Sequence, residues 1–169
     1  MNRMVRKWMS GLGMLWLALA TSGAIAQTFP HKPIRLVVPF PAGGGTDAMA
    51  RTLGESLSRE FGQPVLVENK AGAGTVIGND FVAKSAPDGH TLLLNTSAIA
   101  IVPSLFAKLP YAQDSAFAPI MLLGRAPNVA VVRADSPLKS AREFLADAKS
   151  NPGKVAYGSA GNGTSTHLA

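Results

Sequence analysis

The sequence predicts an α/β protein whose mostly parallel sheet is covered by helices on both faces. Three observations support this class. Short apolar runs rich in Val, Leu and Ile alternate with segments of helical periodicity, the connections between them are short, and glycine-rich turns directly follow two of the runs. Continuous apolar runs are typical of strands that are buried on both faces, as in parallel sheets.

The first three strand–helix units are predicted within residues 34–105. Strands are expected over 34–38, 64–68 and 91–94, and Asn95-Thr96-Ser97 opens the third helix. The first two helices have apolar residues at helical spacing: Ala50, Leu53, Leu57 and Phe61 in one, Val76, Ile77, Phe81 and Val82 in the other. Either Thr46 or Asp47 can cap the first of these helices, and Gly62 suits its C′ position.

The remaining residues give a less regular pattern. Residues 103–119 mix a short helix with a loop, and strands are expected over 120–123, 129–132 and 155–157. Ser140 and Glu143 form a capping box that starts a helix, which Asn151-Pro152-Gly153 ends.

The first 26 residues have the composition of a secretory signal peptide. Three basic residues precede a short apolar run, and Ala24-Ile25-Ala26 forms a small-x-small cleavage site, so the cut is expected after Ala26. A membrane anchor is the alternative, but the apolar run is short for a membrane span.

The whole chain carries a net charge of +6, and three of its positive charges belong to the first 26 residues. The rest has no basic run, which argues against nucleic-acid binding, and the absence of cysteine excludes thiolate–metal sites.

Two glycine-rich loops are the strongest functional signals. Gly43-Gly44-Gly45-Thr46-Asp47 follows the first strand, and residues 158–167 follow the last. Each is read as strand, turn and helix start, a geometry that directs backbone N–H groups at an anion. Two such loops suggest two walls of one cleft for a small carboxylate. The alternative is a tight turn before a capped helix. Asp47 could cap the helix, repel an acidic ligand or accept from a ligand amine, and capping is the safest assignment.

Catalytic patterns are weak by comparison. The sequence has no Gly-x-Ser-x-Gly elbow and no His-Glu-x-x-His motif, and its three histidines suggest no cluster. His167 is interpreted as a packing residue. The spacing Gly72-x-Gly74-x-x-x-Gly78 exceeds the dinucleotide fingerprint by one residue. No catalytic residue, metal or cofactor is therefore expected. An exported α/β hydrolase-like enzyme acting on an anionic substrate, with the glycine loops as oxyanion donors, remains the alternative.

Five ordered stretches resemble the substrate-binding proteins of the tripartite tricarboxylate transporter family, also called Bug receptors. They are residues 29–34 (Phe-Pro-His-Lys-Pro-Ile), 37–47, 67–74 (Val-Glu-Asn-Lys-Ala-Gly-Ala-Gly), 86–92 (Ala-Pro-Asp-Gly-His-Thr-Leu) and 157–168. The resemblance spans residues 27–169 and implies a periplasmic receptor with two α/β lobes and a hinge, which closes on a small di- or tricarboxylate-like ligand. The ligand is then delivered to membrane transporter subunits.

The resemblance also implies the site residues. One jaw would comprise Gly43, Gly44, Thr46 and Asp47 with Thr96 and Ser97, and the opposing jaw Ser159, Gly161, Thr164 and Ser165. A complete receptor is expected to be monomeric. A sensor that feeds a two-component system through the same site is a further alternative.

The length of the sequence suggests an incomplete version of this periplasmic-binding-protein-like, two-lobe fold. Residues 27–124 would form the first lobe without its returning C-terminal segment, and residues 125–169 the start of the second lobe. A fragment of this kind would expose apolar surface and dissolve poorly.

Overall fold

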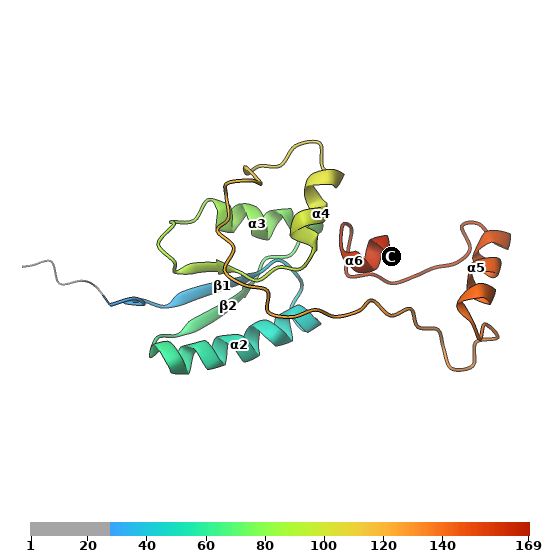
Figure 1. Cartoon of the computed structure of the whole chain (residues 1–169), viewed down its shortest axis with the longest axis horizontal. Coiled ribbons are helices and arrows are strands. Elements are labelled where there is room, and N and C mark those ends of the chain that lie inside the picture. Colours follow the sequence, from blue (N-terminus) through green and yellow to red (C-terminus); the bar gives the residue numbers. More distant parts are fainter. Residues whose placement is uncertain (1–27) are drawn as a thin grey trace, which may run out of the picture. The chain divides into compact units, whose positions relative to one another are not determined.

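The computed structural model describes residues 28–169, so the signal peptide expected at 1–26 lies outside the described residues (Figure 1). Among the described residues, the regular elements lie in 32–169, which group into one unit. In chain order they are β1 (Ile34–Val38), α2 (Gly45–Phe61), β2 (Val65–Asn69), the 3-10 turn η1 (Ala73–Thr75), α3 (Val76–Ala83), β3 (Thr91–Leu93), α4 (Ala98–Leu105), α5 (Ala141–Ser150) and α6 (Ser165–Leu168).

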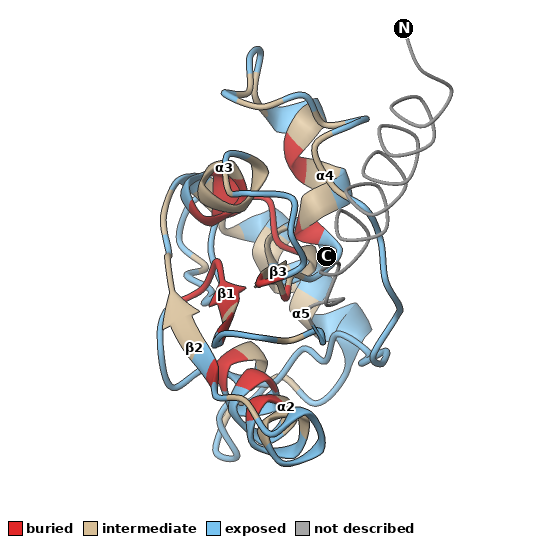
Figure 2. Cartoon of the chain, turned by 90° about the vertical axis from the view of Figure 1, so that its left-hand side faces the viewer, coloured by how far each residue is buried: buried red, intermediate tan, exposed pale blue. Residues whose placement is uncertain are grey.

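The three strands form a parallel sheet in the order β2-β1-β3. At its centre, Leu36 of β1 lies opposite Val67 of β2 and Leu92 of β3. Helices α2 and α3 lie on opposite faces of the sheet (Figure 2). This arrangement confirms the α/β class and the predicted strand–helix order up to residue 105. It also places the carboxyl ends of all three strands at one edge of the sheet.

Side-chain alternation along β1 explains how both faces are covered. One face contributes to a core cluster whose members are Ile34, Leu36, Val38, Phe40, Ala50, Val65, Leu94 and Ala98. Burying one such aliphatic side chain contributes about 1.5–3 kcal/mol. On the other face, Arg35 pairs with Glu68 at 2.6 Å and lies over the ring of Phe81 in α3, 4.7 Å from its centroid. A charged residue is tolerated within this strand because its guanidinium is both paired and stacked.

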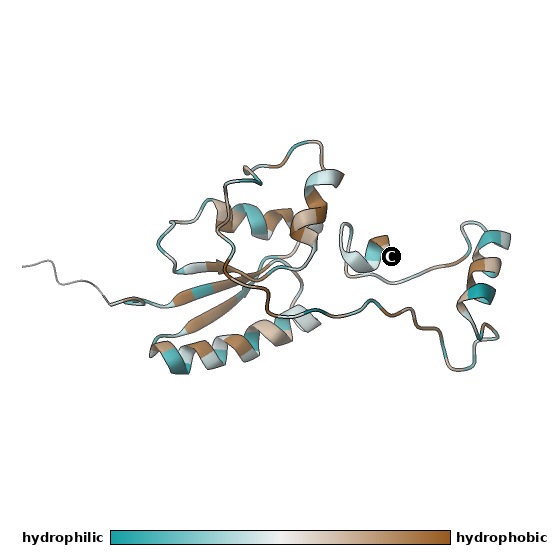
Figure 3. Cartoon of the chain, in the orientation of Figure 1, coloured by the Kyte–Doolittle hydropathy of each residue, from teal (hydrophilic) through white to brown (hydrophobic). Residues whose placement is uncertain are grey.

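The strands predicted over 120–123, 129–132 and 155–157 are wrong, because none of these segments forms a ladder in this structure. Ile120 and Val131 are 77% and 84% exposed, and Figure 3 shows apolar residues along this extended part of the chain. An apolar run becomes a strand only when a neighbour accepts its backbone hydrogen bonds. Within residues 28–169 these runs have no such neighbour.

The predicted start of α5 at Ser140 is confirmed, with the return bond of the capping box shifted by one residue. Ser140 is the N-cap, and its Oγ accepts a hydrogen bond from the Glu143 amide at 3.2 Å. The Glu143 carboxylate accepts in return from the backbone N–H of Lys139 at 2.6 Å. The first bond satisfies an amide that the first helical turn otherwise leaves unpaired, and the second holds the residue before the N-cap against the helix.

Replacing Ser140 with alanine is expected to destabilise α5 by about 1 kcal/mol, because the Glu143 amide loses its acceptor. Hydrogen exchange should then be faster at Glu143 than in the unsubstituted chain. Ser150→Ala, at the exposed last residue of the same helix, is the matched control. Equal exchange at Glu143 in the two variants would contradict the cap.

Candidate functional site

The first glycine loop joins β1 to α2 at the carboxyl edge of the sheet. Gly43 has φ +85°, a conformation that favours glycine, and Gly44 is the N-cap of α2 in an extended conformation. No side chain caps this helix, so the prediction that Thr46 or Asp47 is the N-cap is wrong. Gly43 and Gly44 are exposed and Thr46 is half-buried, which leaves the first turn of α2 accessible from solvent.

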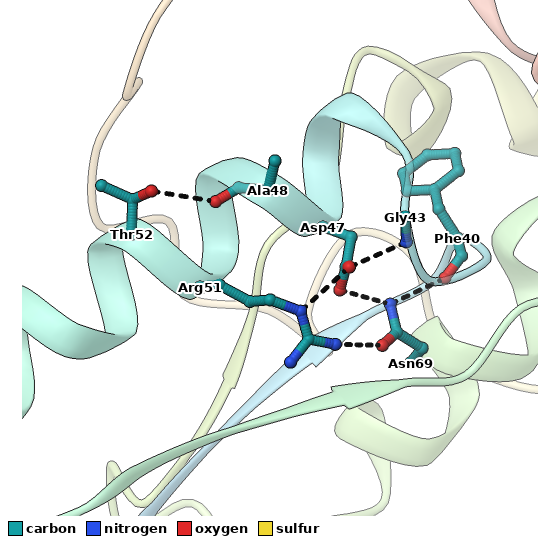
Figure 4. A network of polar contacts seen from close by, with 7 residues as sticks. All are labelled: Phe40, Gly43, Asp47, Ala48, Arg51, Thr52 and Asn69. Carbon is teal, nitrogen blue, oxygen red and sulfur yellow. Dashed lines mark hydrogen bonds and ion pairs between the residues drawn. The ribbon is translucent and has the colours of Figure 1, made fainter.

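Asp47 lies beneath this loop and holds it to the sheet (Figure 4). Its Oδ2 accepts from the Gly43 amide at 2.8 Å and from Arg51 Nε at 3.0 Å, and its Oδ1 accepts from Asn69 Nδ2 at 3.0 Å. The side-chain Nδ2 of Asn69 also donates to the backbone carbonyl of Phe40 at 3.1 Å. The carboxylate is buried and both of its oxygens are engaged within the protein. This network therefore fixes the backbone of the glycine loop.

The charge of Asp47 is stabilised by the same contacts. The hydrogen bond from Arg51, followed by those from Gly43 and Asn69, lowers the pKa of Asp47 to about 2. The group is therefore ionised at neutral pH, and a helix N-terminus is a favourable place for that negative charge.

A second loop, after β3, carries Thr96 and Ser97. Both side chains are exposed, and Ser97 is the N-cap of α4 without capping it through its hydroxyl. The Thr96 amide donates to Asn95 Oδ1 at 2.7 Å, and the Thr96 hydroxyl accepts from the Ala98 amide at 3.3 Å. Because β3 pairs with β1, this loop and the glycine loop belong to the same edge of the sheet, as the sequence predicted.

The turn after β2 completes this edge, and it is absent from the set of site residues predicted from the sequence. Residues Gly72, Ala73, Gly74 and Thr75 have successive positive φ angles of 135°, 46°, 61° and 86°. Alanine and threonine rarely adopt this conformation, and residues held in it cluster at functional sites. The one signal that the sequence offers for this turn is the repeated glycine at 72, 74 and 78, which resembles a nucleotide fingerprint without matching it.

The predicted opposing jaw has hydroxyl groups that bond largely to their own loop. Thr164 is buried, and its hydroxyl donates to the carbonyl of Gly161 at 2.7 Å. The Ser159 hydroxyl accepts from the Gly161 amide at 3.4 Å, and Ser165 Oγ donates to Asn128 Oδ1 at 3.3 Å. Gly161 has φ +114°. The loop is thus a folded turn at the start of α6, with Thr164 as the N-cap.

The second glycine loop, residues 158–167, contacts the first three strand–helix units through α4 and the turn after β2. A Cβ added at Gly163 would lie 3.0 Å from Leu105 Cδ1, and one added at Gly74 would lie 2.7 Å from the carbonyl oxygen of Asn162. Within residues 28–169, no hydrogen bond or ion pair joins the two glycine loops directly.

A groove of about 720 Å³ lies at the amino ends of β1 and β3, away from these loops. Its charged residues form ion pairs. Lys32 pairs with Asp88 and Lys84 pairs with Asp80, each with 2.8 Å between Nζ and a carboxylate oxygen. Over the described residues, no group of three or more His, Asp or Glu side chains is arranged to hold a metal ion. No helix within 28–169 has the length and apolar character needed to cross a membrane.

The fold and the loops at its carboxyl edge are those of a periplasmic-binding-protein-like α/β protein. Residues 49–169 match the model of the tripartite tricarboxylate transporter family receptor, and the chain belongs to this family. Among curated relatives, it is 45% identical over 156 residues to the UPF0065 protein in the tcbD-tcbE intergenic region of Pseudomonas sp. strain P51, covering 90% of this chain and 46% of that protein. It is 42% identical over 163 residues to BugT of Bordetella pertussis, covering 93% of this chain and 50% of BugT.

Solved structures show the same relationship. Periplasmic binding protein BugD matches with a TM-score of 0.70 and 38% identity, over 83% of this chain and 47% of BugD. The R. palustris protein Rpa4515, solved with adipate, matches with a TM-score of 0.77 and 31% identity, over 83% of this chain and 47% of Rpa4515. MatC from Rhodopseudomonas palustris, with bound malate, matches with a TM-score of 0.62 and 37% identity, over 72% of this chain and 42% of MatC. The chain thus spans about half the length of the relatives it matches.

Proposed function

We propose that this chain contributes the first half of a periplasmic solute-binding protein, which holds a small dicarboxylate at the carboxyl edge of its sheet. The ligand is then passed to membrane subunits of a tripartite tricarboxylate-type transporter. The chain takes part in binding and not in catalysis. This organisation assigns residues 27–124 to one lobe and residues 125–169 to the start of a second, with export through a signal peptide cut after Ala26.

The observation that carries the proposal is the uncapped start of α2. Gly44 and Gly45 leave the first-turn amides free of side-chain caps, and the helix dipole adds positive potential at the same point. A Cβ added at Gly44 would meet only the carbonyl oxygen of Pro41 at 3.7 Å. The fold therefore does not require glycine there, whereas close approach of a ligand to the backbone does.

The ligand class follows from the relatives. Two solved proteins that resemble this chain hold adipate and malate, which are both dicarboxylates. A dicarboxylate needs two anion-binding points, and the two glycine loops would supply them. In this assignment Gly44 and Thr46, with Thr96 and Ser97, bind one carboxylate, while Gly43, whose amide donates to Asp47, shapes the loop. The opposing jaw is formed by Ser159, Gly161, Thr164 and Ser165.

Asp47 has an indirect role in this proposal. Both of its oxygens accept hydrogen bonds from the protein, so it acts by holding the Gly43 amide in place. A buried carboxylate near an anionic ligand would otherwise repel it. The Arg51 guanidinium, 3.0 Å from the carboxylate, offsets that repulsion.

Replacing Gly44 with leucine tests the proposal. The side chain would fill the space in front of the α2 amides, and adipate affinity measured by calorimetry on the full chain should fall by about 100-fold or more. The melting temperature should change little, because the added Cβ makes only ordinary contact in the fold.

Gly124→Leu is the matched control, since a Cβ at Gly124 meets nothing within 4 Å and the residue lies outside the loops. It should bind adipate as the unsubstituted chain does. Equal affinity of the Gly44 and Gly124 variants would refute the role of the first loop.

A further inference from the structure

A buried polar network connects the loops at the carboxyl edge of the sheet, and Asn79 is its centre. Asn79 lies in the first turn of α3 and has no exposed surface. Its Nδ2 donates to Thr75 Oγ1 at 3.2 Å and to Tyr111 Oη at 3.1 Å, and its Oδ1 accepts from Asn95 Nδ2 at 2.7 Å. Both donor hydrogens and an acceptor position are used, as a buried amide requires.

One arm of the network reaches the turn after β2. Thr75 is buried and has φ +86°, an unfavourable conformation for a β-branched residue. Such a conformation persists only where surrounding contacts hold it. The bond from Asn79 anchors the Thr75 hydroxyl, while the Thr75 amide donates to the Gly72 carbonyl at 3.1 Å. The side-chain contact thus holds the strained turn from inside the protein.

The other arm reaches the loop after β3. Asn95 donates to Asn79 with its amide nitrogen, and its Oδ1 accepts from the Thr96 amide at 2.7 Å. The position of the Thr96 backbone therefore depends on Asn95, and that of Asn95 depends on Asn79. Because β2 and β3 flank β1, the network joins the two loops on either side of the first glycine loop.

We propose that Asn79 is a positioning residue for the ligand site, which holds the turn 72–75 and the loop 95–97 in a fixed relation. The proposal rests on the proposed function. The turn also carries Gly74, which lies against the carbonyl of Asn162 in the second glycine loop. Asn79 thereby sets the surface on which that loop rests. The residue itself is buried and touches no ligand.

The test compares Asn79→Leu with the control Leu57→Ala in the full chain, by hydrogen exchange and by calorimetry with adipate. Leucine has a similar shape to asparagine but removes all three hydrogen bonds, so the Asn95 Nδ2 and the hydroxyls of Thr75 and Tyr111 lose their Asn79 partner. Leu57 packs against the core from α2 and belongs to neither loop, so its truncation reports general destabilisation.

In Asn79→Leu, exchange of the Thr75 and Thr96 amides should rise about tenfold more than in Leu57→Ala, after correction for global stability. Adipate affinity should fall about tenfold in Asn79→Leu and stay within about twofold of the unsubstituted value in Leu57→Ala. Tyr111→Phe removes one hydroxyl and keeps the ring contact with Phe117. In this variant the exchange rate of the Thr75 amide should rise less, by about threefold. Tyr111→Phe supplies the test if the leucine variant does not fold.

Exchange that rises uniformly across β1 and α3 in Asn79→Leu, with unchanged adipate affinity, would show that Asn79 only fills the core. Unchanged exchange at Thr75 in Tyr111→Phe would likewise overturn the proposal. If the unsubstituted chain does not bind adipate, the proposed function fails. The exchange rates at Thr75 and Thr96 still decide whether Asn79 holds the two loops.

Discussion

Replacing Gly78 with alanine is expected to lower the melting temperature of the chain by about 3–8 °C. Gly78 lies on the side of α3 that packs against the ends of β1 and β2. A Cβ there would lie 2.7 Å from Pro39 Cβ and 2.9 Å from the carbonyl oxygen of Lys70. Pro39 is fully buried, and Lys70 continues the pairing of β2 through a 2.8 Å bond from its amide to the Val38 carbonyl. Neither neighbour can yield without disturbing the sheet edge.

Two opposing effects decide the sign of this change. Alanine is favoured over glycine within a helix by about 1 kcal/mol. Overpacking against backbone costs about 1–3 kcal/mol, and here α3 would have to move away from both strands. We therefore expect the clash to dominate, as measured by thermal unfolding followed by circular dichroism.

Gly45→Ala is the control for this prediction. A Cβ at Gly45, the first residue of α2, meets nothing within 4 Å. Its melting temperature should equal or exceed that of the unsubstituted chain. A Gly78 variant as stable as the Gly45 variant would contradict the close approach of α3 to the ends of the strands.

The second large effect is expected for Asp47→Asn, which should reduce the dependence of stability on acid pH. The pKa of Asp47 is lowered to about 2 in the folded chain, from an ordinary value of 3.8. The unfolded state therefore binds more protons than the folded state between these values. Asp47 stabilises the fold fully above the unfolded pKa, and this contribution is lost as the pH falls through about 2.

Urea unfolding of both proteins between pH 2 and pH 7 measures this contribution. The stability difference between the unsubstituted chain and Asp47→Asn should be largest at neutral pH and shrink below about pH 4. Asp80→Asn is the control, since Asp80 forms an i,i+4 pair with the exposed Lys84. Pairs of this kind contribute little. A stability difference for Asp47→Asn that is independent of pH would contradict the assigned network.

The sheet and its helices could be predicted from sequence because their signals are local. The apolar run at 34–38 and the helical spacing that ends at Gly62 are independent of distant residues, and β1 and the αL cap are both observed. The runs at 120–123 and 129–132 look equally strand-like. They remain extended because strand formation needs a neighbouring strand, which the local sequence cannot reveal.

The candidate site was predicted less completely for the same reason. Gly43, Thr96 and Ser97 were assigned to one edge because they follow parallel strands, and the structure places them there. The contacts of Asp47 with Asn69, and of Asn79 with Asn95, join residues 22 and 16 positions apart through the tertiary fold. No periodicity indicates such pairs. Composition also gave no sign that Thr75 would adopt a positive φ.

The most direct test of the central claim is a titration of the ¹⁵N-labelled full chain with adipate, followed by assigned amide chemical shifts. We predict saturable shifts that are largest at the amides of residues 43–46 and 96–98. Shifts centred on the groove around Lys32 and Lys84, or no saturable shift at the carboxyl edge of the sheet, would contradict the account.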